Sequence, residues 1–224
     1  MKQNLTSINI LLDRSGSMIK LTNETLAGFN SFLAEQKAVP GAATLTLATF
    51  ASDYTLIHDS VPLDSVSDLT PQDYKTGGYT CLLYALGKTI DSVGQKLASL
   101  PEEERPSKVI LIVMTDGAEN HSHRLPDTFT RKQVFDKITH QQDKYSWTIA
   151  FLGCSQDQVD DAINLGITTA NSIAFSADGA GVAASYNSIS SNMAAYRGGN
   201  VAKVNFFDQD KQVIVPAPIV IINK

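Results

Sequence analysis

The sequence predicts a doubly wound α/β domain: a mostly parallel β-sheet with one antiparallel edge strand and helices on both faces. Two observations support this. Residues 5–12 and 108–114 are almost continuously aliphatic, as strands are when a parallel sheet buries both of their faces. The segments between the strands repeat their apolar residues every three to four positions, as helices do when they pack on a sheet. The alternation of the two patterns indicates a Rossmann-like topology.

Three further segments are expected to be strands. Residues 44–50 alternate between apolar and polar side chains, residues 54–58 follow after a short turn, and residues 147–153 form another buried run that begins at Trp147. The close spacing of 44–50 and 54–58 predicts a hairpin, and therefore an antiparallel strand at one edge. The chain thus contains at least five strands, and we expect Trp147 to lie in the core.

Five helices fill the gaps. The first carries the apolar stripe Leu26, Phe29 and Leu33, with Thr22 as its expected N-cap and Pro40-Gly41 as its stop. The second and third are recognised by their apolar stripes, and the fourth by Ser155 as N-cap and Gly166 as a left-handed C′ residue. The fifth contains many Ser and Asn residues, which have lower helix propensity. The second to fifth helices are expected, in this order, around residues 82–97, around 134–138, at 155–166 and at 180–196.

Composition indicates one soluble domain. The chain has 224 residues, 43% of them hydrophobic and 18% charged, with a formal net charge of −5. This acidic balance does not favour nucleic acid or anionic membranes as partners. The two cysteines, Cys81 and Cys154, form no C-x-x-C pair, so neither a disulfide framework nor a cysteine zinc site is expected. Because residues 1–6 do not resemble a secretory leader, we expect a cytoplasmic protein.

The chain is expected to divide near the sequence RGGN, residues 197–200. Residues 1–199 would form the α/β domain, and residues 200–224 a β-rich extension that packs on the domain or on a neighbouring subunit. The apolar segment 213–222 is too short to span a bilayer and contains two prolines. An exposed hairpin within the tail, residues 201–224, would offer a route to self-association.

Oxygen-bearing side chains gather where two predicted strands end. Asp13 ends the first strand and Asp116 follows the strand 108–114. Parallel strands bring their carboxyl ends to one edge, where ligands bind, so both carboxylates should lie on the same rim. Thr80 precedes the second helix on that rim, after Gly77 and Gly78, which allow a close approach of the backbone.

The motif D-x-S-x-S at residues 13–17 completes a candidate metal site. A turn at Gly16 would aim Asp13, Ser15 and Ser17 at one point, where Thr80 and Asp116 add further oxygen donors. A set of oxygens without His or Cys favours Mg²⁺, with Mn²⁺ or Ca²⁺ as alternatives. Two carboxylates balance a divalent cation while hydroxyls donate weakly. The cation would therefore accept an external carboxylate.

Three motifs together resemble a known family. DRSGS (13–17), GGYTCLLYAL (77–86) and MTDGAEN (114–120) resemble the three loops of the metal-ion-dependent adhesion site of von Willebrand factor A domains, also called integrin I-like domains, and in particular bacterial or phage single-domain members. The resemblance implies a vWA fold and a protein-binding function that needs a divalent metal. Its implied metal ligands are the hydroxyls of Ser15, Ser17 and Thr80, and Asp13 and Asp116 directly or through water.

The resemblance also implies a partner protein that presents an Asp or Glu carboxylate. The expected partner contacts on the rim are Tyr79, Asn120 and His121. Tyr79 has two interpretations, an exposed aromatic anchor or a side chain packed on the neighbouring helix. His121 and His123 are more simply an exposed loop than a zinc site, because no further Cys or His is spaced to complete one.

One departure from the family pattern concerns the second loop. Tyr84 stands where bacterial and phage-like members often carry an acid. We expect this position to be helical and outside the set of metal ligands.

No catalytic residue is predicted. A haloacid-dehalogenase-like phosphatase needs a second acid where this chain has Ser15, and an esterase elbow needs glycine where it has Asp13. Walker A and G-x-G-x-x-G motifs are absent from the expected positions. Two alternatives to a binding domain remain open: a metal-assisted hydrolase of a phosphate ester, and an adaptor for a chaperone-like ATPase.

Overall fold

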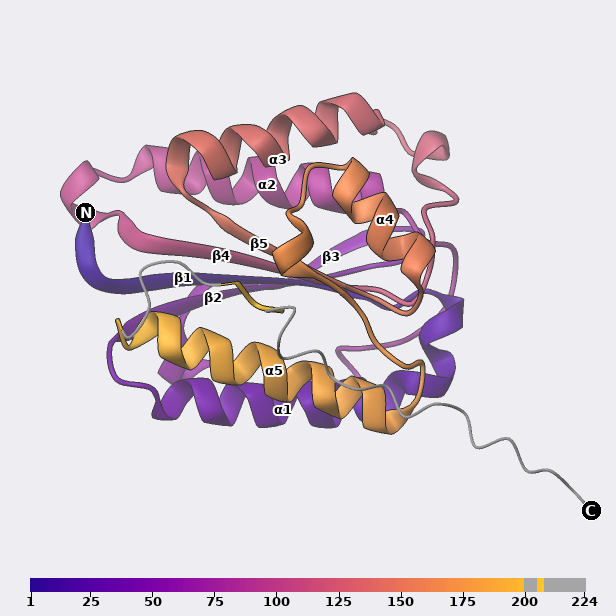
Figure 1. Ribbon diagram of the computed structural model, residues 1–224, viewed down its shortest axis with the longest axis horizontal. Coiled ribbons are helices and arrows are strands. Elements are labelled where there is room, and N and C mark those ends of the chain that lie inside the picture. The colour runs from indigo at the N-terminus through magenta and orange to yellow at the C-terminus, as the bar shows by residue number, and fades with distance from the viewer. Residues whose placement is uncertain (200–204, 208–224) are drawn as a thin grey trace, which may run out of the picture.

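The computed structural model describes residues 1–199 and 205–207, which form a six-stranded sheet covered by helices on both faces (Figure 1). The order across the sheet is β3-β2-β1-β4-β5-β6. β3 runs antiparallel to β2, and all other neighbouring strands are parallel. This confirms the predicted fold class, including the antiparallel edge strand. The strands are β1 (Lys2–Asp13), β2 (Ala42–Phe50), β3 (Tyr54–Pro62), β4 (Pro106–Met114), β5 (Thr148–Gly153) and β6 (Ser172–Ala174).

Helices α1 and α5 pack side by side on one face of the sheet. Helices α2 and α3 pack on the other face (Figure 1). α4 packs against β5 and β6 at one end of the sheet. Ser155 accepts a hydrogen bond from the Gln158 N–H as the N-cap of α4, and Gly166 follows the helix with φ of +93°, both as predicted. The helices are α1 (Thr22–Ala38), α2 (Leu82–Ser99), α3 (Arg131–Tyr145), α4 (Gln156–Asn164) and α5 (Gly179–Arg197).

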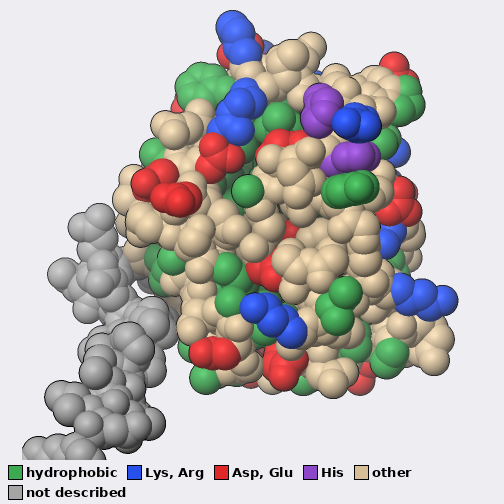
Figure 2. Space-filling view, turned by 90° about the vertical axis from the view of Figure 1, so that its right-hand side faces the viewer, with side chains coloured by type: hydrophobic (Ala, Val, Ile, Leu, Met, Phe, Trp, Pro, Cys, Tyr) green, Lys and Arg blue, Asp and Glu red, His purple; other side chains and the backbone are tan. Residues whose placement is uncertain are grey.

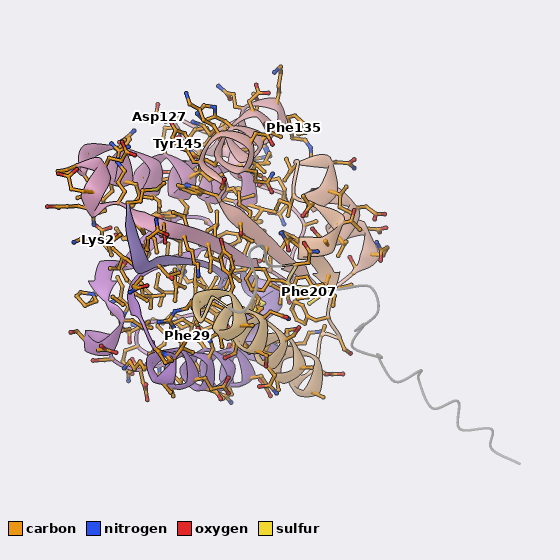
Figure 3. The ribbon with its side chains drawn as sticks, turned by 60° about the vertical axis from the view of Figure 1, so that its left-hand side comes forward. Lys2, Phe29, Asp127, Phe135, Tyr145 and Phe207 are labelled. Atoms are coloured by element: carbon orange, nitrogen blue, oxygen red, sulfur yellow. The ribbon has the colours of Figure 1, made fainter. Side chains whose placement is uncertain are left out.

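Alternate residues of the central strands enter two separate hydrophobic cores. Ile8 and Ile10 of β1 pack with Phe29 of α1 in the core under α1 and α5. Leu11 lies on the opposite face, in the core under α2 and α3. Figure 3 shows Phe29 between α1 and the sheet. Trp147 is buried in the second core, as predicted. Packing on both faces explains why the central strands are almost continuously aliphatic.

Two local features differ from the expectations. The short edge strand β6 was not predicted from the sequence. The expectation that Thr22 caps α1 was wrong, because a 3₁₀ helix (Gly16–Leu21) runs directly into α1. The Thr22 hydroxyl therefore lies inside continuous helical structure and donates a hydrogen bond to the Ile19 carbonyl at 3.0 Å.

Two of the described residues beyond α5 lie against the domain. Phe206 and Phe207 are buried in the core under α1 and α5. The Phe206 N–H donates to the Asn171 side chain at 2.9 Å and the Phe207 N–H to the Ala170 carbonyl at 2.9 Å. The predicted self-association through the tail 201–224 falls on residues that, apart from 205–207, lie outside the described ones. Within the described part of the chain, no helix has the length and apolarity needed to cross a membrane.

Candidate metal centre

The candidate centre lies at the carboxyl edge of the sheet, where β1 and β4 are direct neighbours. Asp13 is the last residue of β1, and Asp116 follows β4 by two residues, so both acids reach the same rim, as predicted. Figure 2 views the molecule from this side and shows acidic side chains among uncharged ones, with two histidine side chains close together near the upper edge. Three loops form the rim: residues 13–17, 76–81 and 115–123.

Hydrogen bonds join four of the five predicted site residues. The Asp13 side chain is fully buried and accepts hydrogen bonds from the Ser15 N–H at 2.7 Å and the Thr115 hydroxyl at 2.5 Å. The Ser15 and Ser17 hydroxyl oxygens lie 3.2 Å apart. Ser17 in turn donates a hydrogen bond to the Asp116 carboxylate. The loop 13–17 therefore turns its oxygens toward the loop that carries Asp116.

Thr80, the fifth residue, is buried beside these acids. A Cβ atom built on Gly117 would lie 2.6 Å from the Thr80 hydroxyl oxygen and 3.4 Å from an Asp13 carboxylate oxygen, so both border one spot next to Gly117. The loop of Thr80 is bound to the first loop through the Gly16 N–H, which donates to the Gly78 carbonyl at 3.0 Å. Gly78 has φ of +82°, a conformation that favours glycine.

Burial shapes the electrostatics of the two acids. It raises the pKa of Asp13 from 3.8 to about 6, although hydrogen bonds from Thr115 and Ser15 lower it and the charge of Asp116 adds to the rise. Burial also raises the pKa of Asp116, against the hydrogen bond from Ser17 and the nearby positive charge of Lys20. Two carboxylates thus share a desolvated site that disfavours their charged forms.

The donor set fits a divalent cation. Among the described residues neither Asp13 nor Asp116 forms an ion pair with a basic side chain, and the adjacent Arg14 pairs with Asp53 instead. The site differs from one built mainly of His, Cys, Asp and Glu: no group of three or more such side chains suited to a metal ion occurs in residues 1–199 and 205–207. Two acids with three hydroxyls form a hard oxygen site whose charge a divalent ion would balance.

The third loop contains residues that sequence reasoning missed. The Glu119 carboxylate accepts hydrogen bonds from the Leu83 N–H of α2 at 2.8 Å and from the Ser122 N–H of its own loop at 2.7 Å. Asn120 and Thr80 exchange two hydrogen bonds, of 2.9 and 3.1 Å. One signal was available: α2 begins without a Ser, Thr, Asp or Asn directly before it, so another segment has to supply its cap.

Two side chains from outside the three loops also hold the rim and were not predicted. The buried Tyr74 hydroxyl donates to the Asp13 main-chain carbonyl. Gln158 of α4 donates to the Asp116 carbonyl at 2.9 Å and accepts from the Cys154 N–H at 2.6 Å. The contacts of Tyr74 with Asp13 and of Gln158 with Asp116 join segments far apart in the sequence, and no pattern within either segment indicates them.

The expected partner contacts lie next to Thr80 on the rim. Tyr79 is 58% exposed and is therefore not packed away on the neighbouring helix, and its role as a partner contact stays a prediction. Its ring stacks on His121, with centroids 4.2 Å apart and planes 10° from parallel. Asn120 is exposed as well. Tyr84 lies in α2 as expected, and its hydroxyl accepts a hydrogen bond from Lys88 at 3.0 Å.

No family model matches the sequence, and neither does any curated protein sequence. Solved structures do match the fold. A von Willebrand factor type A protein from Catenulispora acidiphila is 16% identical with a TM-score of 0.57, over 88% of this chain and 43% of that one. The mussel byssus proximal thread matrix protein 1, with a zinc-occupied MIDAS motif, is 14% identical with a TM-score of 0.56, over 86% and 46%.

A third match covers nearly all of its counterpart. The vWF domain of the type V pili tip protein Mfa5 from Porphyromonas gingivalis is 11% identical with a TM-score of 0.57, over 86% of this chain and 96% of that domain. The chain spans less than half of the other two proteins. The resemblance predicted from the three motifs is confirmed at the level of the fold: this chain folds as a von Willebrand factor A domain.

Proposed function

We propose that this chain is a metal-dependent protein-binding domain, of the adhesion or adaptor kind, and not an enzyme. The observation that carries the proposal is the convergence of three oxygen-bearing loops on two carboxylates, the buried Asp13 and the half-buried Asp116, that form no ion pair with a basic side chain among the described residues. The comparison structures support it, because one of them has a zinc-occupied site of the same type. Mg²⁺ is the ion we propose, since every donor is a hard oxygen.

Each of the five residues has a proposed role. The Ser15, Ser17 and Thr80 hydroxyls would bind the ion, and Asp13 and Asp116 would balance its charge directly or through water. A bound divalent ion would supply an electrophilic position for the carboxylate of an Asp or Glu in a partner protein. The hydrogen bonds that Asp13 accepts from Ser15 and Thr115 hold its carboxylate in place before any ion binds.

The rim around the centre would contact the partner. The exposed Tyr79 is held by its stacking on His121 and by the hydrogen bond from its N–H to the Ser52 hydroxyl at 2.9 Å. An aromatic side chain that is ordered before binding loses little conformational entropy in an interface. The exposed Asn120 lies beside it on the same rim.

Titration calorimetry with Mg²⁺ tests the metal site. We expect Asp13→Ala, Ser15→Ala and Asp116→Ala each to weaken Mg²⁺ binding by at least about tenfold, because each removes a donor or its counter-charge. Asp136→Ala, which changes an exposed acid of α3, is the matched control and should leave the affinity unchanged. Equal Mg²⁺ affinity in the wild type and all three site variants would refute the proposal.

The partner and the class of function need their own test. Proteins captured from the native host with Mg²⁺ and lost with a chelator are the candidate partners. The expected partner loses binding when one Asp or Glu is changed to the amide, because the amide cannot supply a charged ligand. Mg²⁺-dependent hydrolysis of an aryl phosphate that disappears in Asp116→Ala would replace this proposal with the hydrolase alternative.

A further inference from the structure

The start of α2 is capped by another loop. In the described chain, the Cys81 side chain makes no capping hydrogen bond, and the first turn of α2 holds no acid. The first N–H groups of a helix have no intrahelical acceptor and need one from elsewhere. The Leu83 N–H donates to the Glu119 carboxylate at 2.8 Å, and the Tyr84 N–H to the Ser122 hydroxyl at 3.1 Å.

Glu119 is the centre of this arrangement. One of its carboxylate oxygens accepts hydrogen bonds from the His121 N–H at 2.9 Å and the Ser122 N–H at 2.7 Å. The other accepts from the Leu83 N–H and from the Ser122 hydroxyl at 2.6 Å. With two donors on each oxygen, this carboxylate is committed to the backbone of the third loop and of α2.

The link lies between two of the proposed metal donors. Thr80 is two residues before α2, and Asp116 is three residues before Glu119. Asn120, the next residue, binds the Thr80 backbone at 2.9 and 3.1 Å. The separation of the Thr80 hydroxyl from the Asp116 carboxylate therefore depends on how the third loop is fastened to α2.

We propose that Glu119 is a positioning residue for the metal centre: it fastens the third loop to α2 and so holds Thr80 and Asp116 at the separation that binds the ion. The metal part of this inference rests on the proposed function. Groups that orient metal ligands typically change metal affinity by 10- to 100-fold when they are removed. Glu119 would act in this way without touching the ion.

The substitution Glu119→Gln tests the proposal because it breaks chiefly one contact. Glutamine can keep one oxygen toward the His121 and Ser122 N–H groups. Its NH₂ group then faces the Leu83 N–H, so a donor meets a donor and the link from Glu119 to α2 is lost, while the Tyr84 N–H can still donate to the Ser122 hydroxyl. The control Glu102→Gln makes the same chemical change at an exposed position in the 3₁₀ helix Glu102–Glu104.

Two measurements are made on each protein: Mg²⁺ affinity by calorimetry, well below the melting temperature, and amide hydrogen exchange of the metal-free protein by NMR. For Glu119→Gln we expect about tenfold weaker Mg²⁺ binding and faster exchange at Leu83 and Thr80. Glu102→Gln should match the wild type in both. Mg²⁺ affinity within about twofold of the wild type, with the link at Leu83 lost, would show that Glu119 only stabilises the fold and would overturn the proposal.

The experiment separates this inference from the proposed function. If the wild type itself binds no Mg²⁺, the proposed function fails, and the exchange data still decide the fastening role. Faster exchange at Thr80 in Glu119→Gln would then support that role, because the Thr80 N–H bonds to Asn120 and not to Glu119. Unchanged exchange at Thr80 would overturn it.

Discussion

The two ends of the sheet hold charged side chains of opposite sign, basic at one end and acidic at the other. At the end where α5 stops, the Arg197 guanidinium donates to the Gln36 carbonyl at 2.6 Å and to the Gly41 carbonyl at 3.1 Å. The Lys108 ammonium donates to the Tyr196 carbonyl at 2.5 Å, in the last turn of α5 (Figure 1). Cations at the C-terminal end of a helix also interact favourably with its dipole. Carbonyl groups of the chain accept hydrogen bonds from both cations, although burial lowers the pKa of Arg197 and its Nε atom has no acceptor among the described residues.

At the rim, the charges are left for something else to balance. Asp13 and Asp116 are desolvated, and both have pKa values raised by burial. Their contacts within the described chain come from hydroxyl and N–H groups, which donate hydrogen bonds but carry no full positive charge. One end of the sheet therefore contributes stability, and the other end keeps a cost that a bound cation would remove. A site built for binding commonly carries such a cost.

The largest expected effect on stability comes from removing the hydrogen bonds of Arg197, at the end of the sheet where α5 stops. Arg197→Ala removes the hydrogen bonds to the Gln36 and Gly41 carbonyls, and the Gln36 carbonyl keeps the longer hydrogen bond from the Val39 N–H at 3.3 Å. We expect a loss of about 3 kcal/mol in the free energy of unfolding, measured by urea denaturation. Arg131→Ala is the matched control, because its ion pair with Asp161 is largely exposed, and it should cost less than about 1 kcal/mol. Equal losses in the two variants would contradict the contrast.

At the rim, we expect a substitution to increase the free energy of unfolding rather than to reduce it. Asp13→Asn removes a buried charge while its amide can still accept from the Ser15 N–H and donate to the Thr115 hydroxyl. A pKa raised from 3.8 to about 6 corresponds to roughly 3 kcal/mol at most, so we expect the metal-free protein to gain about 2 kcal/mol at neutral pH. Mg²⁺ at a concentration that saturates the wild type should narrow this difference, because the wild type gains more binding free energy than the variant.

The pH dependence follows from the direction of the shift. Because the folded state holds the Asp13 proton more tightly than the unfolded state, this group makes the wild type less stable as the pH rises from 3.8 to about 6. The advantage of Asp13→Asn in the metal-free protein should therefore be small near pH 4 and complete above about pH 6. Urea denaturation in a chelator across this range measures it, and a difference that does not vary with pH would contradict it.

The sequence predicted the elements that have long hydrophobic patterns. Residues 5–12 and 108–114 had to be buried on both faces, and this placed Asp13 and Asp116 on one rim without knowledge of any loop. β6 was missed because a strand of three residues is too short to show a period. Thr22 was assigned as a cap because a cap residue before an apolar stripe is a common helix start, but the 3₁₀ turn before it left no helix end to cap.

The contacts that hold the rim were harder to predict for a different reason. Glu119, Gln158 and Tyr74 each bond to backbone atoms of a distant segment, and such bonds depend on loop conformations that no periodic pattern determines. The site residues had a pattern that could be found because their chemistry requires particular side chains. Residues that bind backbone carry no such requirement, so only the folded chain identifies them.

The smallest expected effect is on Mg²⁺ affinity and comes from Lys20, a basic side chain near the acids of the rim. Lys20 lies close enough to Asp116 to lower its pKa, yet it is exposed and makes no ion pair with Asp116 in the described chain. It would repel an incoming cation, so Lys20→Gln should tighten Mg²⁺ binding by about twofold at low ionic strength and by less at high ionic strength, where screening weakens exposed charges. Calorimetry at the two ionic strengths measures this. Weaker Mg²⁺ binding in Lys20→Gln would mean that the lysine orients Asp116, and the rim would then depend on a basic side chain, as the opposite end does.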